Sequence, residues 1–391
     1  MILTFIFKSF SVEIPIFNKE LNVNSIIYYH SFVYYIMLIT SGKIKFKINR
    51  ELGIIYLILG FFFLRVIINP SEIEYFIDFL QISIIVTIIY QILEISSIND
   101  IYIINNTIII TGVIISIIGI LQFIGNNYFG YNIVFLYKHT GTYLFGDMIL
   151  GSKVVRANST FGANANAYGI FTASWYVLYL FRKKVLIDYN LQFIIVTSIA
   201  LVSLFMSFSR SSIIILFLMI IIYLLVYSNK KYKIRIIVFS IILMPLITKF
   251  INEFVNFYSV LRDISYTSGH LYQNILAINI IKSNWLFGVG FNPNTPGTET
   301  TWLGIWLLFG IIPFLTFSYI VIKFLVKCIL VIQNNINHNI SFSAWYFIPI
   351  MYIAQGFTRV AIFDNMLWIS IIIGSIIFQK EKEGLLIGST S

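Results

Sequence analysis

Long apolar runs alternate with short polar clusters along the chain of 391 residues. Each run holds about 17–22 residues, and at 1.5 Å per residue such a helix crosses a ~30 Å hydrocarbon core. The pattern predicts an all-α, polytopic integral membrane protein with 11 or 12 transmembrane helices in a single domain, residues 1–391. The spans are expected near residues 25–41, 52–69, 75–94, 103–124, 164–181, 190–208, 211–228, 236–251, 301–322, 341–357 and 365–379.

The first apolar segment, residues 2–17, carries Lys8, Glu13 and Pro15. These residues oppose insertion, so we expect the segment to span poorly or to lie in the membrane interface. No small-residue cleavage site follows the segment, and a cleavable signal peptide is therefore not expected.

Two stretches between spans are too long to be simple turns: the outer loop 125–163 and the large outer loop 252–300. Loops of this length in a compact protein are usually functional or disordered. Both contain aromatic residues and short amphipathic stretches, such as 255–261 and 270–281. We therefore expect both loops to be ordered, with short amphipathic helices that lie on the helix bundle.

Composition excludes a soluble globular protein, because 59% of the residues are hydrophobic and the mean hydropathy is +0.89. The net charge of +10 comes mostly from basic residues in alternate loops, which predicts that this side is cytoplasmic. Their dispersal over short loops argues against nucleic-acid binding. The single cysteine, Cys328, excludes a disulfide framework and a cysteine-based metal site. Fifteen of the 26 basic residues lie on this side: Lys43, Lys45, Lys47, Arg50, Arg182, Lys183, Lys184, Lys230, Lys231, Lys233, Arg235, Lys323, Lys327, Lys380 and Lys382.

Several cations lie on the predicted outer face, where membrane topology gives no reason for them. Arginine carries a planar fork of donors, which suits bidentate phosphate binding better than the lysine ammonium does. Inside the predicted spans few charges stand out, namely Arg65 and Asp78, both near the outer ends of their helices. The outer cations are Lys138, Lys153, Arg156, Arg210, Lys249, Arg262, Lys282 and Arg359.

The most informative polar run is 156–166, Arg-Ala-Asn-Ser-Thr-Phe-Gly-Ala-Asn-Ala-Asn. It opens onto a predicted span, where Asn164 or Asn166 can cap a helix that begins near residue 165. The positive end of that helix would face the same pocket as Arg156, and together they would bind phosphate or another anion. The alternative is a capped helix after an outer loop, with Arg156 reaching lipid headgroups.

A second polar cluster, 207–212, reads Ser-Phe-Ser-Arg-Ser-Ser and separates two spans with almost no loop. Arg210 near mid-bilayer would cost roughly 2.5–3.5 kcal/mol, so we expect it at the outer boundary or in a wet cavity. The cluster fits an anion site and fits equally a tight turn whose serines satisfy backbone groups.

A third group of elements begins with Trp-Leu-Phe-Gly-Val-Gly-Phe-Asn at 285–292 and ends with Gly-Ile-Ile at 310–312. Between them Glu299 stands at the threshold of a span, where partial burial would suit a general base. The alternative role for Glu299 is a capping charge at a helix N-terminus.

In this order and spacing, the three groups resemble the motifs of the O-antigen polymerase/O-antigen ligase superfamily of bacterial membrane glycosyltransferases. Its members show an arginine and a Gly-Thr-Phe-Gly-Asn-Pro-Asn-like run before a span, which residues 159–166 match with the proline replaced and one asparagine shifted. A Ser-Arg signature at a span boundary follows, matched by residues 209–211. A large outer loop then ends in Gly-Val-Gly-Phe before a span with Gly-Ile-Ile. The resemblance covers residues 156–312.

The resemblance implies a GT-C-like, metal-independent glycosyltransferase without a cofactor. It would polymerise undecaprenyl-diphosphate-linked oligosaccharide repeat units into O-antigen or capsule on the outer face of a bacterial cytoplasmic membrane. Arg156, Arg210 and Arg262 would bind the substrate diphosphate, the last two as catalytic residues, and Glu299 would act on the acceptor hydroxyl. Its partners would be lipid-linked donor and acceptor glycans, membrane lipid, a chain-length regulator and a flippase.

One departure from the family concerns the acceptor side. Ligase-type members carry a His-Asn pair eleven residues before the glycine matched by Gly310, and Glu299 and Thr300 stand there in this chain. In the ligases that histidine is implicated in accepting the sugar hydroxyl, so its loss favours a polymerase over ligase-type transfer to another acceptor. His270 in the large outer loop is a second acceptor-side candidate, although a lone histidine in such a loop is more often structural.

Two other classes of protein stay open. A metal-dependent membrane glycosyltransferase would use paired acids in its first outer loop, for which Glu72 and Glu74 are candidates, although they more simply solvate a turn after Pro70. A flippase or exporter of lipid-linked sugars would need a charged central cavity and pseudo-symmetric halves. The sequence shows no repeat and few charges within its spans, which disfavours this class.

Overall fold

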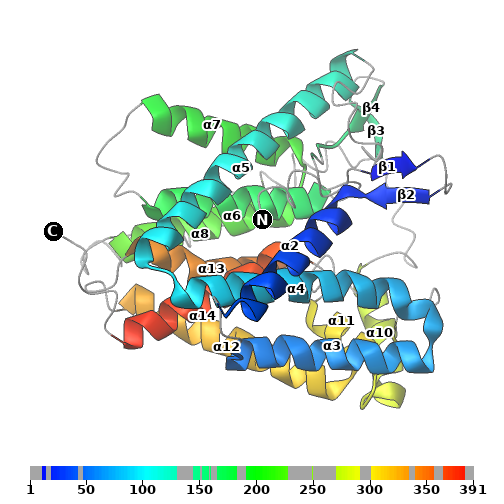
Figure 1. Cartoon of the computed structure of the whole chain (residues 1–391). Coiled ribbons are helices and arrows are strands. Elements are labelled where there is room, and N and C mark those ends of the chain that lie inside the picture. The colour runs from blue at the N-terminus through cyan, green and yellow to red at the C-terminus, as the bar shows by residue number, and fades with distance from the viewer. Residues whose placement is uncertain are drawn as a thin grey trace. The chain divides into compact units, whose positions relative to one another are not determined.

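The computed structural model divides the chain into two compact units, each assembled from interleaved segments. Unit 1 comprises Met1–Ile27, Tyr102–Asp263 and Val331–Ala344, and unit 2 comprises Tyr28–Ile101, Ile264–Leu330 and Trp345–Ser391. Both units are mainly helical where they are described (Figure 1). The structure describes residues 11–14, 19–42, 47–129, 144–149, 152–157, 159, 165–182, 191–227, 249, 270–290, 301–333, 340–355 and 364–383.

Nine of the predicted spans coincide with helices, and their ends agree within a few residues. Four described segments are long and apolar enough to cross a membrane: Arg50–Ile68, Ile73–Ile95, Asp100–Phe129 and Ile311–Gln333. The described part of the chain is therefore largely helical, with four segments able to span a membrane. The predicted span 236–251 lies outside the described residues apart from Lys249. The coinciding helices are α2 (Val23–Thr40), α3 (Arg50–Ile68), α4 (Ile73–Ile95), α5 (Ile98–Ile124), α6 (Ala165–Arg182), α7 (Leu191–Met206), α8 (Arg210–Tyr227), α13 (Ile340–Gln355) and α14 (Asn365–Lys382).

The predicted span 301–322 is wrong, because the chain breaks at Gly310 into α11 (Thr301–Phe309) and α12 (Ile311–Gln333). In one continuous helix, residues 302 and 317 would lie about 22 Å apart along the axis. The rings of Trp302 and Phe317 are instead 6.1 Å apart, so the chain bends sharply at Gly310. With nine residues, or about 14 Å, α11 is too short to cross the hydrocarbon core.

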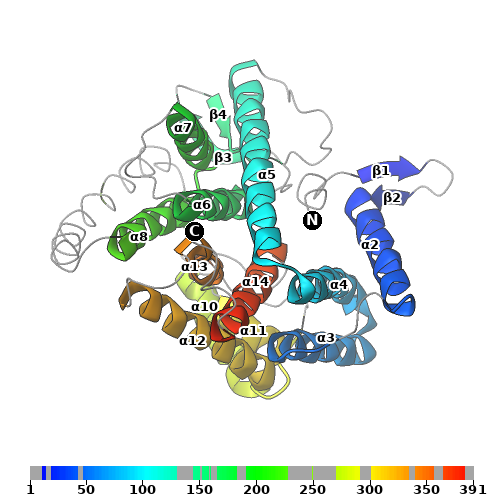
Figure 2. The same ribbon diagram turned by 60° about the vertical axis from the view of Figure 1, so that its left-hand side comes forward.

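The core of unit 2 is aromatic and lies between helices that are apolar on all sides. On α14, Trp368 packs edge-on against Phe79 of α4 and Phe317 of α12, with ring centroids 5.7 and 6.2 Å apart. Phe62 of α3 stacks on Phe79 at 5.0 Å and meets Phe309 of α11 at 4.4 Å. Helices α3 and α4 run side by side, and α14 contacts both of them (Figure 2). A helix buried on every face, as α14 is between residues 366 and 377, belongs at the centre of such a bundle.

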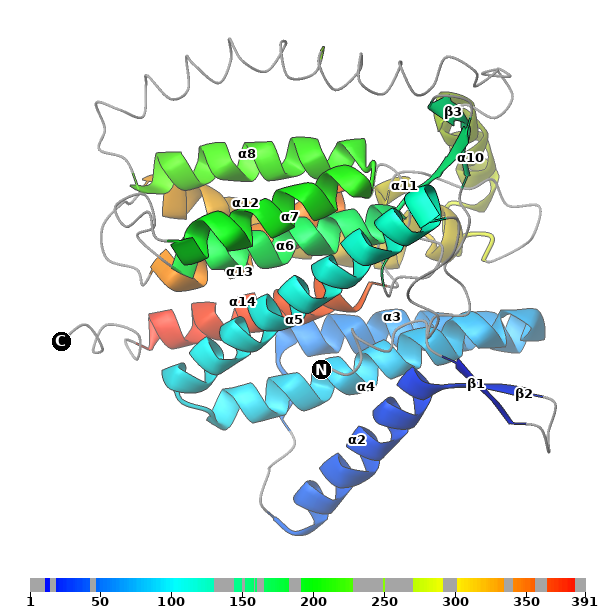
Figure 3. The ribbon, with the colours of Figure 1, turned by 90° about the horizontal axis from the view of Figure 1, so that it is seen from above.

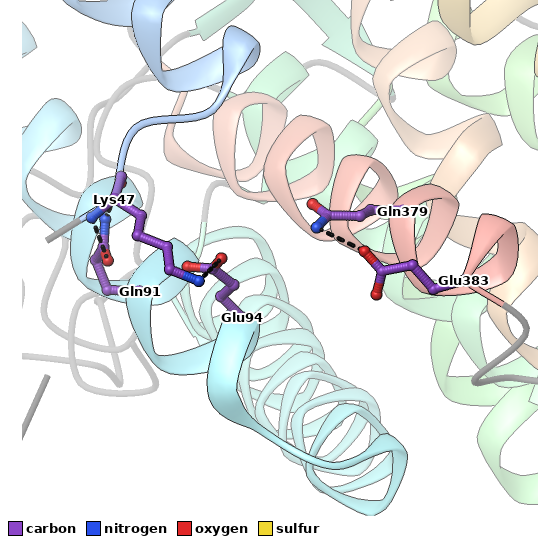
Figure 4. A network of polar contacts seen from close by, with 5 residues as sticks. All are labelled: Lys47, Gln91, Glu94, Gln379 and Glu383. Carbon is purple, nitrogen blue, oxygen red and sulfur yellow. Dashed lines mark hydrogen bonds and ion pairs between the residues drawn. The ribbon is translucent and has the colours of Figure 1, made fainter. Parts of the chain in front are cut away.

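Polar contacts lie at the ends of the unit 2 helices that the basic loops predict to be cytoplasmic. Lys47 Nζ lies 2.8 Å from Glu94 Oε1 at the end of α4, beside Gln91, which accepts a bond from the Lys47 backbone (Figure 4). Gln379 donates to Glu383 at the end of α14, 3.1 Å away. The Lys47 contacts place the residues just before α3 at the same end of unit 2 as the end of α4, as the alternating topology requires.

Lys323 and Lys327 were predicted in a basic loop, and the structure places both within α12 instead. Lys323 pairs with Glu51 in the first turn of α3, and Lys327 Nζ lies 2.8 Å from Glu381 Oε2 of α14. A lysine is tolerated inside an apolar helix when its ammonium finds a carboxylate near the helix end. The helix therefore continues past the point where charge alone predicts a boundary.

Two short hairpins interrupt the all-α architecture. Strands β1 (Ser11–Ile14) and β2 (Lys19–Asn22) pair antiparallel within the N-terminal region. In the outer loop 125–163, a π-helical turn η2 (Gly125–Phe129) extends α5, and β3 (Leu144–Ile149) pairs with β4 (Ser152–Val155). This hairpin stands where short amphipathic helices were expected. In the large outer loop the expected helix at 270–281 is present as α10 (His270–Asn284), while 255–261 lies outside the described residues.

In unit 1, α6 is buried along almost its whole length and packs against α7 and α8 (Figure 3). Two glycines of α5 make room for its largest rings. A Cβ on Gly112 would lie 2.2 Å from the Trp175 ring, and one on Gly119 would lie 2.1 Å from the Tyr168 hydroxyl. This close approach of α5 and α6 fixes the helix that follows the Arg156 run.

Candidate functional site

Arg156 connects the first two polar clusters. Its Nε donates to the backbone oxygen of Ser207, 2.7 Å away, and its Nη2 donates to Asn166 Oδ1, 3.0 Å away. The next backbone amide, of Ala157, donates to the Met206 oxygen at 3.0 Å. The run 156–166 and the cluster 207–212, which the sequence separates by forty residues, therefore form one site in unit 1. The half-buried guanidinium is held in a fixed orientation at this junction.

Ser159 anchors the same run to α5. Its backbone amide donates to Gln122 Oε1 at 2.8 Å, and its hydroxyl donates to the Ile115 oxygen at 2.6 Å. The residue has φ of 51°, a left-handed conformation that a non-glycine residue adopts only under local constraint. Both Ser159 and Gln122 are buried, so these bonds are shielded from water. The segment after Arg156 is thus held by α5, whereas Arg156 itself binds the turn that follows α7.

Two helix N-termini meet next to Arg156. α6 begins at Ala165, as the sequence predicted, and α8 begins at Arg210. A Cβ on Gly169, in the first turns of α6, would lie 2.8 Å from Ser209 Cβ and 2.8 Å from Ser212 Oγ. The positive ends of both helix dipoles are therefore adjacent and stabilise negative charge placed there.

The turn between α7 and α8 is tied by its own serines. Ser207 Oγ donates to the Leu204 oxygen at 2.6 Å and accepts from the Ser209 amide at 3.2 Å. The Ser209 and Ser212 hydroxyls are 2.7 Å apart, and Phe208 has φ of 49°. The tight-turn alternative is therefore present, and it supplies the carbonyl that Arg156 binds. The backbone of Arg210 is described, and the position of its side chain is not.

A buried polar group lies deeper in unit 1. The hydroxyl of Tyr168 lies 2.5 Å from Ser203 Oγ of α7 and donates to the Ser116 oxygen of α5 at 3.3 Å. Hydrogen bonds between helices in an apolar medium fix their relative position. Tyr168 therefore joins α5, α6 and α7, and its partner Ser203 lies one helical turn before Ser207, whose carbonyl binds Arg156.

The glycine motif at 288–290 in unit 2 closes the end of α11. The amide of Val289 donates to the Leu307 oxygen at 2.7 Å, and that of Gly290 donates to the Leu308 oxygen at 3.1 Å. Gly288 and Gly290 have φ of 68° and 70°, which glycine adopts without strain. These bonds satisfy carbonyls that the helix end leaves without partners. The motif thus has a structural role in this unit.

Arg65 makes the main polar contacts that could not be predicted from the sequence. Its Nη2 donates to Glu72 Oε1 at 2.9 Å and to the Val289 oxygen at 2.6 Å, although Val289 is 224 residues distant. Asn69 Nδ2 donates to the same Glu72 oxygen at 3.2 Å. The side chains of Arg65 and Glu72 are 14% and 1% exposed. The only signal in the sequence was an arginine near the end of an apolar span with an acid seven residues later.

This contact explains Glu72, which was a candidate metal ligand with Glu74. Glu72 is the last residue of η1 (Pro70–Glu72), and its carboxylate pairs with Arg65 of α3. Glu74 is exposed. Among the described residues, no group of three or more His, Cys, Asp or Glu side chains is arranged to hold a metal ion.

Gly290→Ala is expected to destabilise unit 2, because a Cβ there would lie 1.9 Å from Arg65 Nη2 and 2.2 Å from Glu72 Oε1. Overpacking of this kind costs roughly 1–3 kcal/mol. Thermal unfolding in detergent should show a lower midpoint for this variant. Gly60→Ala in α3 is the matched control, since a Cβ there meets no atom within 4 Å, and its midpoint should not fall. Equal midpoints for both variants would contradict the close packing of Arg65 on Gly290.

Of the remaining candidate site residues, the structure describes only the backbone of His270. Arg262 and Glu299 lie outside the described residues, and His270 is the first residue of α10, with its side chain not described. The structure therefore unites Arg156 with the 207–212 cluster and does not test the roles assigned to these three residues. The glycine motif belongs to unit 2 and Arg156 to unit 1.

No protein-family model matches this chain, and comparisons with curated proteins and with solved structures find no match either. The resemblance to the O-antigen polymerase/O-antigen ligase superfamily therefore stays a prediction from the motifs.

Proposed function

We propose that this chain is a membrane glycosyltransferase that polymerises undecaprenyl-diphosphate-linked oligosaccharide repeat units into O-antigen, capsule or a related surface polysaccharide. It would act on the outer face of a bacterial cytoplasmic membrane. The observation that carries the proposal is the pair of bonds from Arg156 to Ser207 and Asn166, which joins two of the three motif groups in one site. The membrane-spanning helices supply the second requirement, because both substrates are lipid-linked.

The reaction transfers a glycan from one polyprenyl diphosphate to the glycan of another. The acceptor hydroxyl oxygen forms a bond to the anomeric carbon of the donor, and the bond from that carbon to the diphosphate oxygen breaks. The hydroxyl proton passes to a base, and undecaprenyl diphosphate leaves with the bonding electron pair. Negative charge therefore grows on the diphosphate in the transition state, and fixed cations beside it lower the barrier.

Arg156 suits this task because its orientation is set before the substrate binds. Two acceptors hold its guanidinium, and the dipoles of α6 and α8 add positive potential at the same place. A preorganised cation needs no rearrangement when charge develops, which is the main source of electrostatic catalysis. Arg210 and Arg262 complete the diphosphate site in this proposal.

The acceptor side is assigned to Glu299, with His270 as the second candidate. Glu299 stands two residues before α11, whose N-terminus at Thr301 would stabilise its carboxylate form. As a carboxylate it would accept the proton of the acceptor hydroxyl. Glu299→Gln should then slow transfer strongly, whereas His270→Asn should change it little. The reverse order of effects would move the acceptor role to His270.

Purified wild-type protein tests the proposal directly. In detergent, with one lipid-linked repeat unit as both donor and acceptor, it should produce a ladder of longer lipid-linked glycans. The ladder should persist in the presence of a metal chelator. A protein that folds and binds the lipid but makes no glycan longer than the starting repeat unit would contradict the proposal. Movement of the lipid across the membrane of vesicles without elongation would indicate a flippase instead.

A further inference from the structure

Three consecutive large apolar side chains are exposed in the turn that follows α10. Trp285, Leu286 and Phe287 are 53%, 38% and 63% exposed. α10 itself packs one side onto Leu307 through Ala277 and Ile281. A contiguous exposed apolar patch of this kind usually marks a binding surface. We name these three residues the apolar turn.

The backbone of the apolar turn is held against the α11–α12 junction. Trp306 Nε1 donates to the Trp285 oxygen at 3.1 Å, and the Gly288 amide donates to the Asn284 oxygen at 2.9 Å. A Cβ on Gly310 would lie 2.1 Å from the Leu286 oxygen and 2.8 Å from Phe287 Cα. Contacts this close fix the backbone of the turn at this junction.

The apolar turn lies against the start of α12, a helix with one exposed apolar face. That helix is long and apolar enough to cross a membrane, and it begins directly after Gly310. Its exposed side chains recur at alternating steps of three and four residues, which places them along one face. This face is open to lipid acyl chains, apart from the Tyr319 ring, which has the Arg50 guanidinium 4.2 Å from its centroid. Its residues are Ile312, Leu315, Tyr319, Ile322, Val326 and Ile329.

We propose that the apolar turn is a bilayer anchor, which inserts Trp285 and Phe287 among the lipids at the Gly310 end of α12. Lys282, exposed in the last turn of α10, lies one turn before Trp285 and reaches the phosphates of the headgroups. Tryptophan and lysine together are typical of the membrane–water boundary, where an apolar body enters lipid and a charged tip stays in water. The end of the large outer loop is thereby held at the membrane surface.

The anchor does not depend on the proposed enzymatic function. It concerns only where the apolar turn lies with respect to the bilayer. It predicts that a segment assigned from sequence to an outer loop contacts acyl chains.

Spin labels at single cysteines test the anchor. The native Cys328 is buried and is replaced by alanine to give a cysteine-free protein, which should elute as the wild type does on gel filtration. Phe287→Cys and Ile278→Cys are then labelled separately in vesicles of phosphatidylcholine and phosphatidylglycerol. Leu315→Cys on the lipid face of α12 and Ser283→Cys on the exposed polar side of α10 are the references. Power saturation with oxygen and with a water-soluble nickel chelate measures the accessibility of each label.

The label at 287 should show an oxygen-to-nickel accessibility ratio close to that at 315 and several-fold above that at 283. The label at 278 reports whether α10 itself also touches lipid, and its ratio should lie between the two references. Nickel access at 287 equal to that at 283 would show an aqueous turn and overturn the proposal. Shielding of 287 from both reagents would overturn it too, because another part of the chain or a protein partner would then cover the turn.

Discussion

Arg156→Ala should abolish long-chain polysaccharide while single lipid-linked repeat units continue to accumulate. The variant removes the bonds to Ser207 and Asn166 and the cation proposed to stabilise the leaving diphosphate. Loss of one preorganised donor of this kind lowers a transfer rate by about 10²–10³-fold. The chain-length distribution on a gel stained for carbohydrate, with protein levels matched by immunoblot, measures the effect.

Two further variants test whether the guanidinium itself is needed, and whether it is needed at this position. Arg156→Lys keeps the charge and lacks the planar fork that serves two acceptors in fixed directions, so it should restore only short chains. Arg182→Ala removes an exposed arginine at the opposite end of α6 and should leave chain length unchanged. Normal chain length in Arg156→Ala at equal protein level would remove this arginine from the site.

Arg65→Ala should lower the free energy of unfolding by about 3–5 kcal/mol, the usual effect of removing one partner from a buried ion pair. The variant leaves the Glu72 carboxylate, 1% exposed, without its cation and also removes the donor to the Val289 oxygen. Denaturation of the purified protein in mixed micelles, followed by tryptophan fluorescence, measures the change.

The exposed pair Lys47–Glu94 provides the matched comparison. Its lysine is 59% exposed, so Lys47→Ala should change the free energy of unfolding by about 0–1 kcal/mol. Replacing both buried partners, Arg65→Met with Glu72→Leu, should recover part of the loss because no buried charge then stays unpaired. A loss in Arg65→Ala no greater than that in Lys47→Ala would show that the buried pair does not hold the glycine motif.

The sequence predicts helices well where a span must satisfy all its backbone hydrogen bonds within itself. A helix in lipid has to satisfy every amide internally and has to match the thickness of the core, so apolar run length nearly determines its ends. α6 was expected at 164–181 and is found at Ala165–Arg182, and α13 was expected at 341–357 and is found at Ile340–Gln355. The same rule explains why the hairpin β3–β4 was not predicted, since it lies between spans.

Hydropathy fails where apolar residues continue through a bend. Residues 301–322 are apolar on both sides of Gly310, and the helix breaks at this glycine, which has φ of 85°. The continuation of α12 past Lys323 depends on Glu51, a contact between segments 272 residues apart. No local pattern contains such a partner.

The sequence singled out Arg156 and the start of α6, whereas the contacts of Arg156 could not be predicted from it. Arg156 stood out because topology gave no reason for an arginine there, and the helix start near 165 followed from the polar run. That Arg156 binds the turn at Ser207 depends on the packing of α6 on α8, where Gly169 permits close approach. The serines around Arg210 proved to tie their own turn, a role that their types alone left open.

The central claim is that Arg156 stabilises the departing diphosphate, and the rate of undecaprenyl diphosphate release tests it most directly. Purified wild-type protein and Arg156→Ala, both folded by gel filtration, are mixed in excess over one lipid-linked donor with saturating acceptor, so that a single turnover is followed. Release from the variant should be slower by about 10²–10³-fold, with Arg182→Ala equal to the wild type. Equal release rates in the wild type and in Arg156→Ala would contradict the account.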